Sequence, residues 1–332
     1  MKPLEKTKKY KVLGVGYCAA DILLNINGNL QENKKIEVRE MSFQGGGPVA
    51  NAMSALSKWG VDTWFAGSIG DDIYGNFIAS TFEDENVNIS ALQVFKRRKS
   101  AVSVCISHGK GLRTILYNKG NAPELKLKGS YLDILNNMNQ FDALEIDGHQ
   151  PEAQMYAVRE CSRLKIPVIL DGGSYRDEIL PFLTIADHII VSKDFADDFS
   201  KHNADICGLS KNYGVVCKKI LKNKAGVAII TLGEKGSIGY DGSRIIHVSA
   251  LGIKVVDTSG AGDIYHAGYI FGLLRGWSLE KRMKFATVVA GLKCRGIGGR
   301  TPVPSIKEAM RVYKQFDRYS HKLKIKKQGG CK

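Results

Sequence analysis

Short runs of β-branched residues alternate with helical stretches along most of the chain. Continuous apolar runs such as Val168–Leu170 and Val227–Ile230 are typical of strands buried on both faces. The candidate strands are Tyr10–Val15, Thr63–Ala66, Ser100–Ser107, Arg113–Tyr117, Ala143–Ile146, Pro167–Leu170, His188–Val191 and Gly226–Thr231. The candidate helices are Pro48–Trp59, Asn76–Glu85, Pro151–Arg163, Tyr213–Leu221, Asp263–Leu274 and Leu279–Lys293. This alternation predicts an α/β fold with a mostly parallel sheet covered by helices on both faces.

Two stretches break this alternation. Residues 21–43 and 95–118 have the polar and apolar alternation of consecutive strands, which predicts a small sheet projecting from the main body. No internal repeat and no linker divides the sequence, so one domain is expected over 1–332. In folds of this class, ligand sites lie beyond the carboxyl ends of the parallel strands. The loops at those ends are therefore the places to search for chemistry.

The charge of the chain is concentrated at its ends. The 332 residues carry 48 Lys and Arg against 33 Asp and Glu, a formal net charge of +15. Residues 1–11 hold five lysines and one Glu, and residues 307–332 hold nine basic and two acidic residues. Eleven of the fifteen excess charges thus lie in terminal segments, and the body is nearly balanced. We therefore expect 319–332 to be a solvated, disordered basic tail, and no nucleic-acid partner for the body.

Apolar runs and cysteines bear on the compartment. No run reaches the ~18 apolar residues of a membrane span, and the lysine-rich N-terminus lacks the apolar stretch of a secretory signal. The seven cysteines are scattered and include no CxxC pair, so neither a zinc site nor a disulfide framework is indicated. A reducing cytoplasm is the expected location, with no membrane partner.

The most informative segment is Val255–Asp263, with the sequence VVDTSGAGD. An apolar strand end leads into a turn of small residues, and an apolar helix follows. Small residues let the backbone approach a ligand, and the first N–H groups of a helix favour an anion. Gly260, Ala261 and Gly262 therefore make a candidate anion hole for a transferring phosphoryl group. Asp263 is the candidate base that accepts a hydroxyl proton, the alternative being a plain helix N-cap.

These residues carry a family resemblance. DTSGAGD and its helix resemble the C-terminal signature of the ribokinase (PfkB-type) carbohydrate kinases. An N-terminal signature, GGGPVANA from Gly45 and GSIGDDIYG from Gly67, lies about 200 residues earlier in the expected order. The resemblance spans roughly residues 10–315. It implies a ribokinase-like three-layer αβα, Rossmann-like core, with a small β-sheet lid formed by about 17–45 and 95–118.

The resemblance also implies roles for individual positions. Asp263 matches the general base, and Gly260–Gly262 match the anion hole for the nucleotide phosphates. The positions expected to bind the sugar are Asp21, Gly46, Gly47, Asn51, Asp147 and His149. Thr231, Gly233 and Gly236 match the TxGxxG loop that binds ATP. The implied reaction is transfer of the γ-phosphoryl group of ATP to a sugar hydroxyl, a reaction that depends on positioning and charge neutralisation.

The resemblance implies partners and cofactors as well. Mg²⁺ is expected to accompany the ATP phosphates, and Asp257 matches a position near a monovalent-cation site, which would take K⁺. Lid sheets in this family often pair between two subunits, so the resemblance implies a homodimer through the lid as one candidate oligomeric state. The GGGP opening and the segment GLKCRGIGGR look closest to ketose kinases, including ketohexokinases and sulfofructose kinases.

Three positions depart from the family pattern. Pro48 stands where many ribokinases have Lys in the Gly-Gly loop, and the NxxE motif is absent near Ser192–Phe195. Asp147 is followed by Gly148 and His149, without the Arg that sulfofructose kinases have two residues after the Asp. A bound sulfonate is therefore not supported, although His149 remains a candidate contact for an anionic sugar, beside the alternative of a loop histidine that contacts nothing.

Several alternatives stay open at this stage. A nucleoside kinase of the same fold would use the same signatures, and a non-enzymatic sugar- or nucleic-acid-binding protein could use the fold without the chemistry. The GxGxxA run from Gly14 resembles a dinucleotide fingerprint, but Asp21–Asn27 then alternates like a strand and offers no helix N-terminus to a pyrophosphate. Asp71 and Asp72 are expected to begin a helix rather than to form a metal pair.

Overall fold

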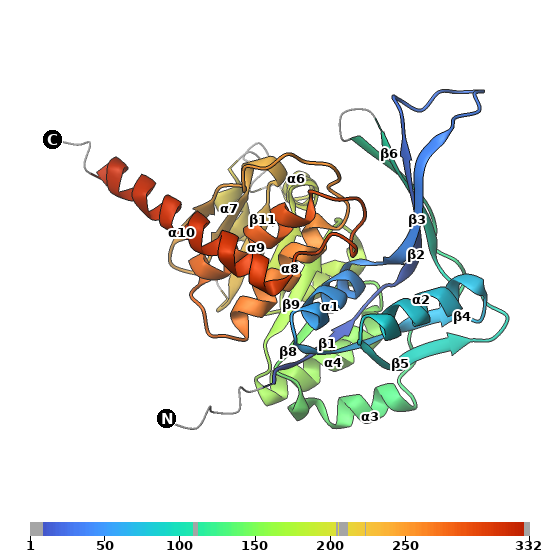
Figure 1. The fold of residues 1–332 in the computed structure, drawn as a ribbon. Coiled ribbons are helices and arrows are strands. Elements are labelled where there is room, and N and C mark those ends of the chain that lie inside the picture. The colour runs from blue at the N-terminus through green and yellow to red at the C-terminus, as the bar shows by residue number, and fades with distance from the viewer. Residues whose placement is uncertain (1–8, 109–111, 204, 206–211, 223, 329–332) are drawn as a thin grey trace, which may run out of the picture.

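The structure is a computed structural model, which describes residues 9–108, 112–203, 205, 212–222 and 224–328. A nine-stranded sheet forms its centre, and a four-stranded sheet projects to one side (Figure 1). In spatial order the large sheet contains β13 (Ile245–Val248), β12 (Ser237–Tyr240), β11 (Val227–Thr231), β10 (His188–Ser192), β9 (Val168–Gly172), β8 (Ala143–Ile146), β1 (Lys11–Val15), β4 (Asp62–Gly70) and β5 (Asn88–Phe95). Its strands pair in parallel except where β12 joins β11 and β13.

Helices cover both faces of the large sheet. The helices of the described residues are α1 (Pro48–Lys58), α2 (Ile73–Asp84), α3 (Ser130–Asn136), α4 (Pro151–Leu164), α5 (Leu180–Leu183), α6 (Lys193–Lys201), α7 (Tyr213–Leu221), α8 (Ala261–Leu273), α9 (Leu279–Lys293) and α10 (Ile306–Gln328), with short 3₁₀ turns η1 (Met138–Gln140), η2 (Asp177–Ile179) and η4 (Gly233–Lys235). One apolar core lies between the sheet and α1, α2, α8, α9 and α10, and a second between the sheet and α3, α4, α6 and α7. The expected three-layer αβα fold is therefore confirmed.

The smaller sheet has the order β3 (Val38–Gly46), β2 (Ala19–Ile26), β6 (Val102–His108) and β7 (Leu112–Asn118). Its central pair, β2 and β6, is parallel, and both outer pairs are antiparallel. The register places Gln44, Asp21, Ser103 and Tyr117 in one row across the sheet, so these four side chains share a face. This sheet occupies the segments in which the sequence predicts a lid.

Three structural features answer questions left by the sequence. After β1 the chain continues directly into strand β2, so the GxGxxA run does not begin a helix. Asp72 is the N-cap of α2, and its carboxylate accepts a hydrogen bond of 2.9 Å from the Gly75 N–H. Helix α10 continues to Gln328 and includes most of the tail expected to be disordered, whereas 329–332 lie outside the described residues.

No helix among the described residues combines the length and the apolar character required to cross a membrane.

Candidate active site

Asp263 and Asn51 form the centre of the candidate site. The Asn51 amide donates a hydrogen bond of 2.6 Å to Asp263 Oδ2, which joins α1 to the first turn of α8 although 212 residues separate the two positions. Arg300 Nε in turn donates to Asn51 Oδ1 at 2.8 Å. Because its other amide atom is bonded to Arg300, Asn51 is fixed in one orientation toward Asp263.

The N-terminus of α8 supplies the candidate anion hole. Its N-cap is Gly260, which has φ 70° and makes no side-chain capping bond, so the alternative of Asp263 as the N-cap is wrong. A Cβ on Gly260 would lie 2.6 Å from Gly299 Cα, so both the positive φ and this close approach require glycine. Ala261 is half-buried and Gly262 is exposed. An uncapped helix N-terminus with an accessible backbone is suited to binding phosphate.

The electrostatic environment of Asp263 favours a proton acceptor. Burial raises the pKa of Asp263 to about 7, the Asp171 and Asp21 charges act in the same direction, and the Asn51 hydrogen bond opposes them. A carboxyl group with a pKa near neutral pH can take a proton from a reacting hydroxyl and release it again.

Asp21 lies on β2 of the small sheet, beside the Gly-Gly loop. Its Oδ1 accepts a hydrogen bond from the Ser103 hydroxyl, and burial raises its pKa. A Cβ on Gly46 would collide with the Asp21 carboxylate, and one on Gly47, which has φ 105°, would collide with the Tyr17 carbonyl. The structure therefore brings Asp21, Gly46 and Gly47 together. Glycine is required at Gly47 by its backbone conformation, whereas a side chain at Gly46 would displace the Asp21 carboxylate.

Asp147 and His149 follow β8. Both Asp147 carboxylate oxygens are bonded inside the protein, Oδ2 to the Tyr17 N–H and Oδ1 to the His149 N–H, each at 2.9 Å. Asp147 therefore fixes the loop after β1. His149 packs against the Tyr17 ring, with centroids 5.1 Å apart, and Arg176 Nη1 lies 2.7 Å from its Nε2. His149 thus has partners, so the alternative of a loop histidine without contacts is wrong.

The residues of the expected ATP loop join β11 to β12. Thr231 ends β11, and its hydroxyl donates to the Val191 carbonyl at 3.3 Å. Gly233 and Gly236 have φ values of 56° and 89°, and a Cβ on Gly236 would collide with the Val248 carbonyl. This turn is the β11–β12 connection, separate in sequence from the α8 terminus.

Asp257 is buried beside an ammonium group. Its Oδ1 accepts from the Ser259 N–H at 2.9 Å, and its Oδ2 accepts from the Gly298 N–H at 2.8 Å. Lys293, fully buried on α9, donates to the Asp257 carbonyl oxygen at 3.0 Å, and its Nζ is 4.0 Å from Oδ2. Burial alone would raise the pKa of Asp257, but Lys293 and these hydrogen bonds lower it.

The segment expected to carry NxxE has a different role. Ser192 is the N-cap of α6 and accepts a hydrogen bond of 2.9 Å from the Phe195 N–H, while Lys193 pairs with Asp197. Lys193 and Asp194 are exposed. Because this segment presents no buried carboxylate, it does not fit the metal site that the motif would form.

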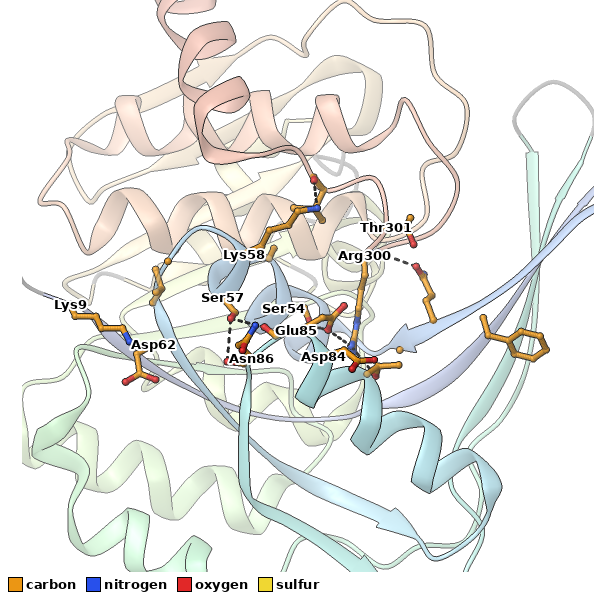
Figure 2. A pocket seen from close by; sticks show the side chains of 18 residues that line it. Lys9, Ser54, Ser57, Lys58, Asp62, Asp84, Glu85, Asn86, Arg300 and Thr301 are labelled. Atoms are coloured by element: carbon orange, nitrogen blue, oxygen red, sulfur yellow. Dashed lines mark hydrogen bonds and ion pairs between the residues drawn. The ribbon is translucent and has the colours of Figure 1, made fainter.

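A cavity of about 690 Å³ is lined in part by Ser54, Ser57 and Lys58 of α1. Figure 2 shows Arg300 extending toward Glu85 in this cavity. Arg300 Nη1 donates to Glu85 Oε2 at 2.8 Å, and Ser54 also donates to this carboxylate. None of the site residues expected from the sequence lines this cavity. Arg300 lines this cavity and also bonds to Asn51, so it links the cavity wall to the candidate site.

Sequence reasoning gave no role to several residues at the site. These are Ser103, Glu145, Asp171, Arg176, His266, Lys293 and Arg300. The one sequence signal was a charged residue inside an apolar strand, as for Glu145 in Ala143–Ile146.

Known proteins resemble this chain over most of its length. The family model described as pfkB family carbohydrate kinase matches residues 9–306. The protein named Ketohexokinase from Mus musculus is 25% identical over 296 residues, which are 86% of this chain and 96% of that relative. An ATP-dependent 6-phosphofructokinase of Thermoanaerobacterium thermosaccharolyticum is 26% identical over 322 residues, covering 92% and 94% of the two chains.

A solved structure agrees in fold. Ribokinase from Arabidopsis thaliana, solved with ribose and ATP, superposes with a TM-score of 0.75 at 22% identity and covers 92% of this chain and 99% of its own. The family match spans both signatures, the α8 terminus and the small sheet. The chain therefore belongs to the pfkB family of carbohydrate kinases, enzymes that transfer a phosphoryl group to a hydroxyl.

Proposed function

We propose that this enzyme transfers the γ-phosphoryl group of ATP to a hydroxyl of a sugar, with Asp263 as the general base. The observation that carries the proposal is the Asn51–Asp263 hydrogen bond at the uncapped N-terminus of α8. It holds a carboxyl group of near-neutral pKa beside backbone N–H groups suited to phosphate. A base and an anion hole next to each other are what phosphoryl transfer needs.

The reaction follows from these positions. Asp263 takes the proton of the sugar hydroxyl as its oxygen attacks the γ-phosphorus. The new oxygen–phosphorus bond forms while the bond to the β-phosphate oxygen breaks, and ADP leaves with that electron pair. The N–H groups of Gly260–Gly262 stabilise negative charge on the transferring group. Asp263 then returns its proton to solvent.

The sugar would occupy the space between the small sheet and the large one, where Asp21 and Asn51 offer polar groups next to Gly46 and Gly47. The small sheet would then act as a lid, whose closure over the site keeps out water that competes as acceptor. His149 and Arg176 add imidazole and guanidinium groups after β8 and β9. An acceptor panel should therefore contain neutral ketoses, pentoses and acidic sugars.

ATP would lie across the ends of β11 and α8, with Thr231, Gly233 and Gly236 around it. Mg²⁺ would arrive with the ATP phosphates and neutralise part of their charge.

The cysteines suit the expected compartment. The buried thiols of Cys18, Cys161 and Cys217 form no disulfide, as is usual in a reducing cytoplasm.

One observation favours a nucleoside as the second candidate acceptor. Tyr117 is 75% exposed and lies on the same sheet face as Asp21, so its ring faces the proposed site. An aromatic ring at that place can stack on a nucleobase. Tyr117→Ala should raise the KM of a nucleoside at least tenfold but that of a sugar only slightly.

The test of the base is Asp263→Asn. We expect the variant to fold and to bind ATP, and to lose about 10²–10⁴-fold in kcat because no carboxylate accepts the proton. Asp133→Asn, which changes an acid in the first turn of α3, is the matched control and should keep full turnover. Near-normal turnover by Asp263→Asn would show that another group is the base.

A further inference from the structure

Three ionisable side chains meet beneath the N-terminal half of α8. Glu145 lies in β8 and Asp171 in β9, and the parallel register pairs Glu145 with Ile169, so the two carboxylates share one face of the sheet. His266 descends from α8 onto that face. The exposures of Glu145, Asp171 and His266 are 0%, 5% and 4%.

Their ligand atoms are close together. One oxygen of each carboxylate and one nitrogen of His266 all lie within 4.8 Å of one another, and His266 Nδ1 is 3.3 Å from Asp171 Oδ2. Metal–ligand bonds to such atoms are about 2.0–2.2 Å for Zn²⁺, so ligands on opposite sides of an ion are about 4 Å apart. The three groups can therefore contact one ion with only small side-chain movements.

Glu145 has no other role in the described structure. Among the residues described, neither carboxylate oxygen of Glu145 has a hydrogen-bond partner. Burial and the nearby charges of Asp171, Asp263 and Asp147 raise its pKa well above the usual range. Burying a carboxyl group with no donor is costly, and buried charges are normally paired or bound to a metal. A positive group facing Glu145 would remove that cost.

His266 is the third candidate ligand, and its two ring nitrogens both face carbonyl oxygens. Nδ1 lies 2.9 Å from the Gly262 carbonyl oxygen and Nε2 lies 3.3 Å from the Ile190 carbonyl oxygen. Burial lowers the pKa of His266 and favours the neutral ring, which has a single N–H. With that proton on Nδ1, the ring donates to the Gly262 carbonyl; with the proton on Nε2, it donates to the Ile190 carbonyl and the Nδ1 lone pair, 3.3 Å from Asp171 Oδ2, is free to bind a cation.

We propose that Glu145, Asp171 and His266 bind a divalent cation of the Mn²⁺ or Zn²⁺ class. Two carboxylates and one imidazole form a mixed oxygen and nitrogen donor set that such ions accept. This ion differs from the Mg²⁺ that accompanies ATP, because all three side chains are buried and belong to the protein interior. The proposal is independent of the proposed function.

The ion would connect the sheet to the anion-hole helix. It would join β8 and β9 to α8 one turn beyond Asp263, and its charge would offset the acidic groups that surround Asp263. We therefore expect the bound ion to stabilise the fold and to lower the pKa of Asp263.

The test uses the full chain without nucleotide. After treatment with a chelator and removal of the chelator, Mn²⁺ or Zn²⁺ alone is titrated while the melting temperature is followed. We expect a saturable rise of several degrees, because an ion that binds only the folded state stabilises it. Glu145→Gln should weaken the apparent affinity at least tenfold. Asp187→Asn, a carboxylate that bonds to the first residue of β9 at its opposite end, is the matched control and should behave as the wild type.

A spectroscopic measurement keeps the proposal falsifiable if Glu145→Gln is unstable. Co²⁺ should give the visible absorption of a site with nitrogen and oxygen ligands, and His266→Asn should change that spectrum. The alternative to a bound ion is a protonated, neutral Glu145 side chain in an empty site. The neutral side chain of Glu145→Gln would mimic that protonated carboxyl group. Equal or higher stability of Glu145→Gln, together with no metal-dependent shift in the wild type, would overturn the proposal.

Discussion

At the scale of single residues, Asp263 must lose its proton before it can act as a base. Burial raises its pKa to about 7, so the protonated, inactive form predominates below that pH. We expect kcat/KM to rise as the pH increases, by about tenfold per unit below the pKa, and to level off above it. A pH–rate profile from 5 to 8.5 measures this. A flat profile would contradict the assignment of Asp263.

The Asn51 hydrogen bond favours the ionised form of Asp263 and therefore opposes that rise in pKa. Asn51→Leu should shift the acid limb of the profile to higher pH. Ser54→Ala, one turn later on α1 and bonded to the Ala50 carbonyl and Glu85, is the control and should leave the limb in place. The position of the limb, rather than its height, is the relevant result, because a general loss of structure would lower the rate at every pH.

Lys293 bears on the expected use of K⁺. Its ammonium lies 3.0 Å from the Asp257 carbonyl oxygen and supplies a positive charge where a monovalent cation was expected. We therefore expect turnover to differ less than about twofold between K⁺ and choline salts. Lys293→Met should create a K⁺ requirement, because Asp257 would then be a buried carboxylate without a counter-charge. Strong activation of the wild type by K⁺ would instead support a cation at Asp257.

At the scale of helices and strands, the sequence predicted the buried elements better than the edge elements. The strand Ala143–Ile146 and the helices Tyr213–Leu221 and Leu279–Lys293 were predicted with the bounds that the structure has. The edge strands β5 and β13 were not predicted, because they combine polar and apolar residues and face solvent on one side. Helix α6 was missed because it is short and mostly charged, with only three apolar residues, although it buries all three of them (Phe195, Ala196 and Phe199).

The N-terminus of α8 makes a prediction at this scale. Gly260→Ala places a Cβ in a residue with φ 70° and against Gly299, so the anion hole must move. We expect about 1–3 kcal/mol of strain and at least a roughly tenfold weaker ATP affinity, measured by calorimetry. Gly276→Ala is the matched control, because its φ is 64° but no atom lies within 4 Å of the added Cβ. Equal ATP affinity in both variants would argue against this turn as the phosphate site.

At the scale of the whole molecule, the site is assembled from segments far apart in the chain. The contacts Asn51–Asp263 and Arg300–Glu85 span 212 and 215 residues. The Asn51–Asp263 contact was predictable, because the N-terminal signature identifies Asn51 and the C-terminal signature identifies Asp263 as residues of one site. Nothing in the sequence predicted that Arg300 would reach Asn51, or that Glu145, Asp171 and His266 would meet, because strand order and helix packing determine these contacts.

The outer face of the small sheet points to self-association, and we expect a homodimer through it. The register places Met41, Phe43 and Leu116 on the face opposite Asp21, and these side chains are 61%, 54% and 58% exposed. Burying such side chains against a second copy stabilises a dimer by removing apolar surface from water. The double variant Met41→Ser, Leu116→Ser should therefore shift the protein toward monomer in light scattering over a range of concentrations. Tyr156→Ser, which changes an exposed apolar side chain on α4, is the control and should stay dimeric. If the wild type is monomeric at every concentration, this apolar face does not mediate dimerisation.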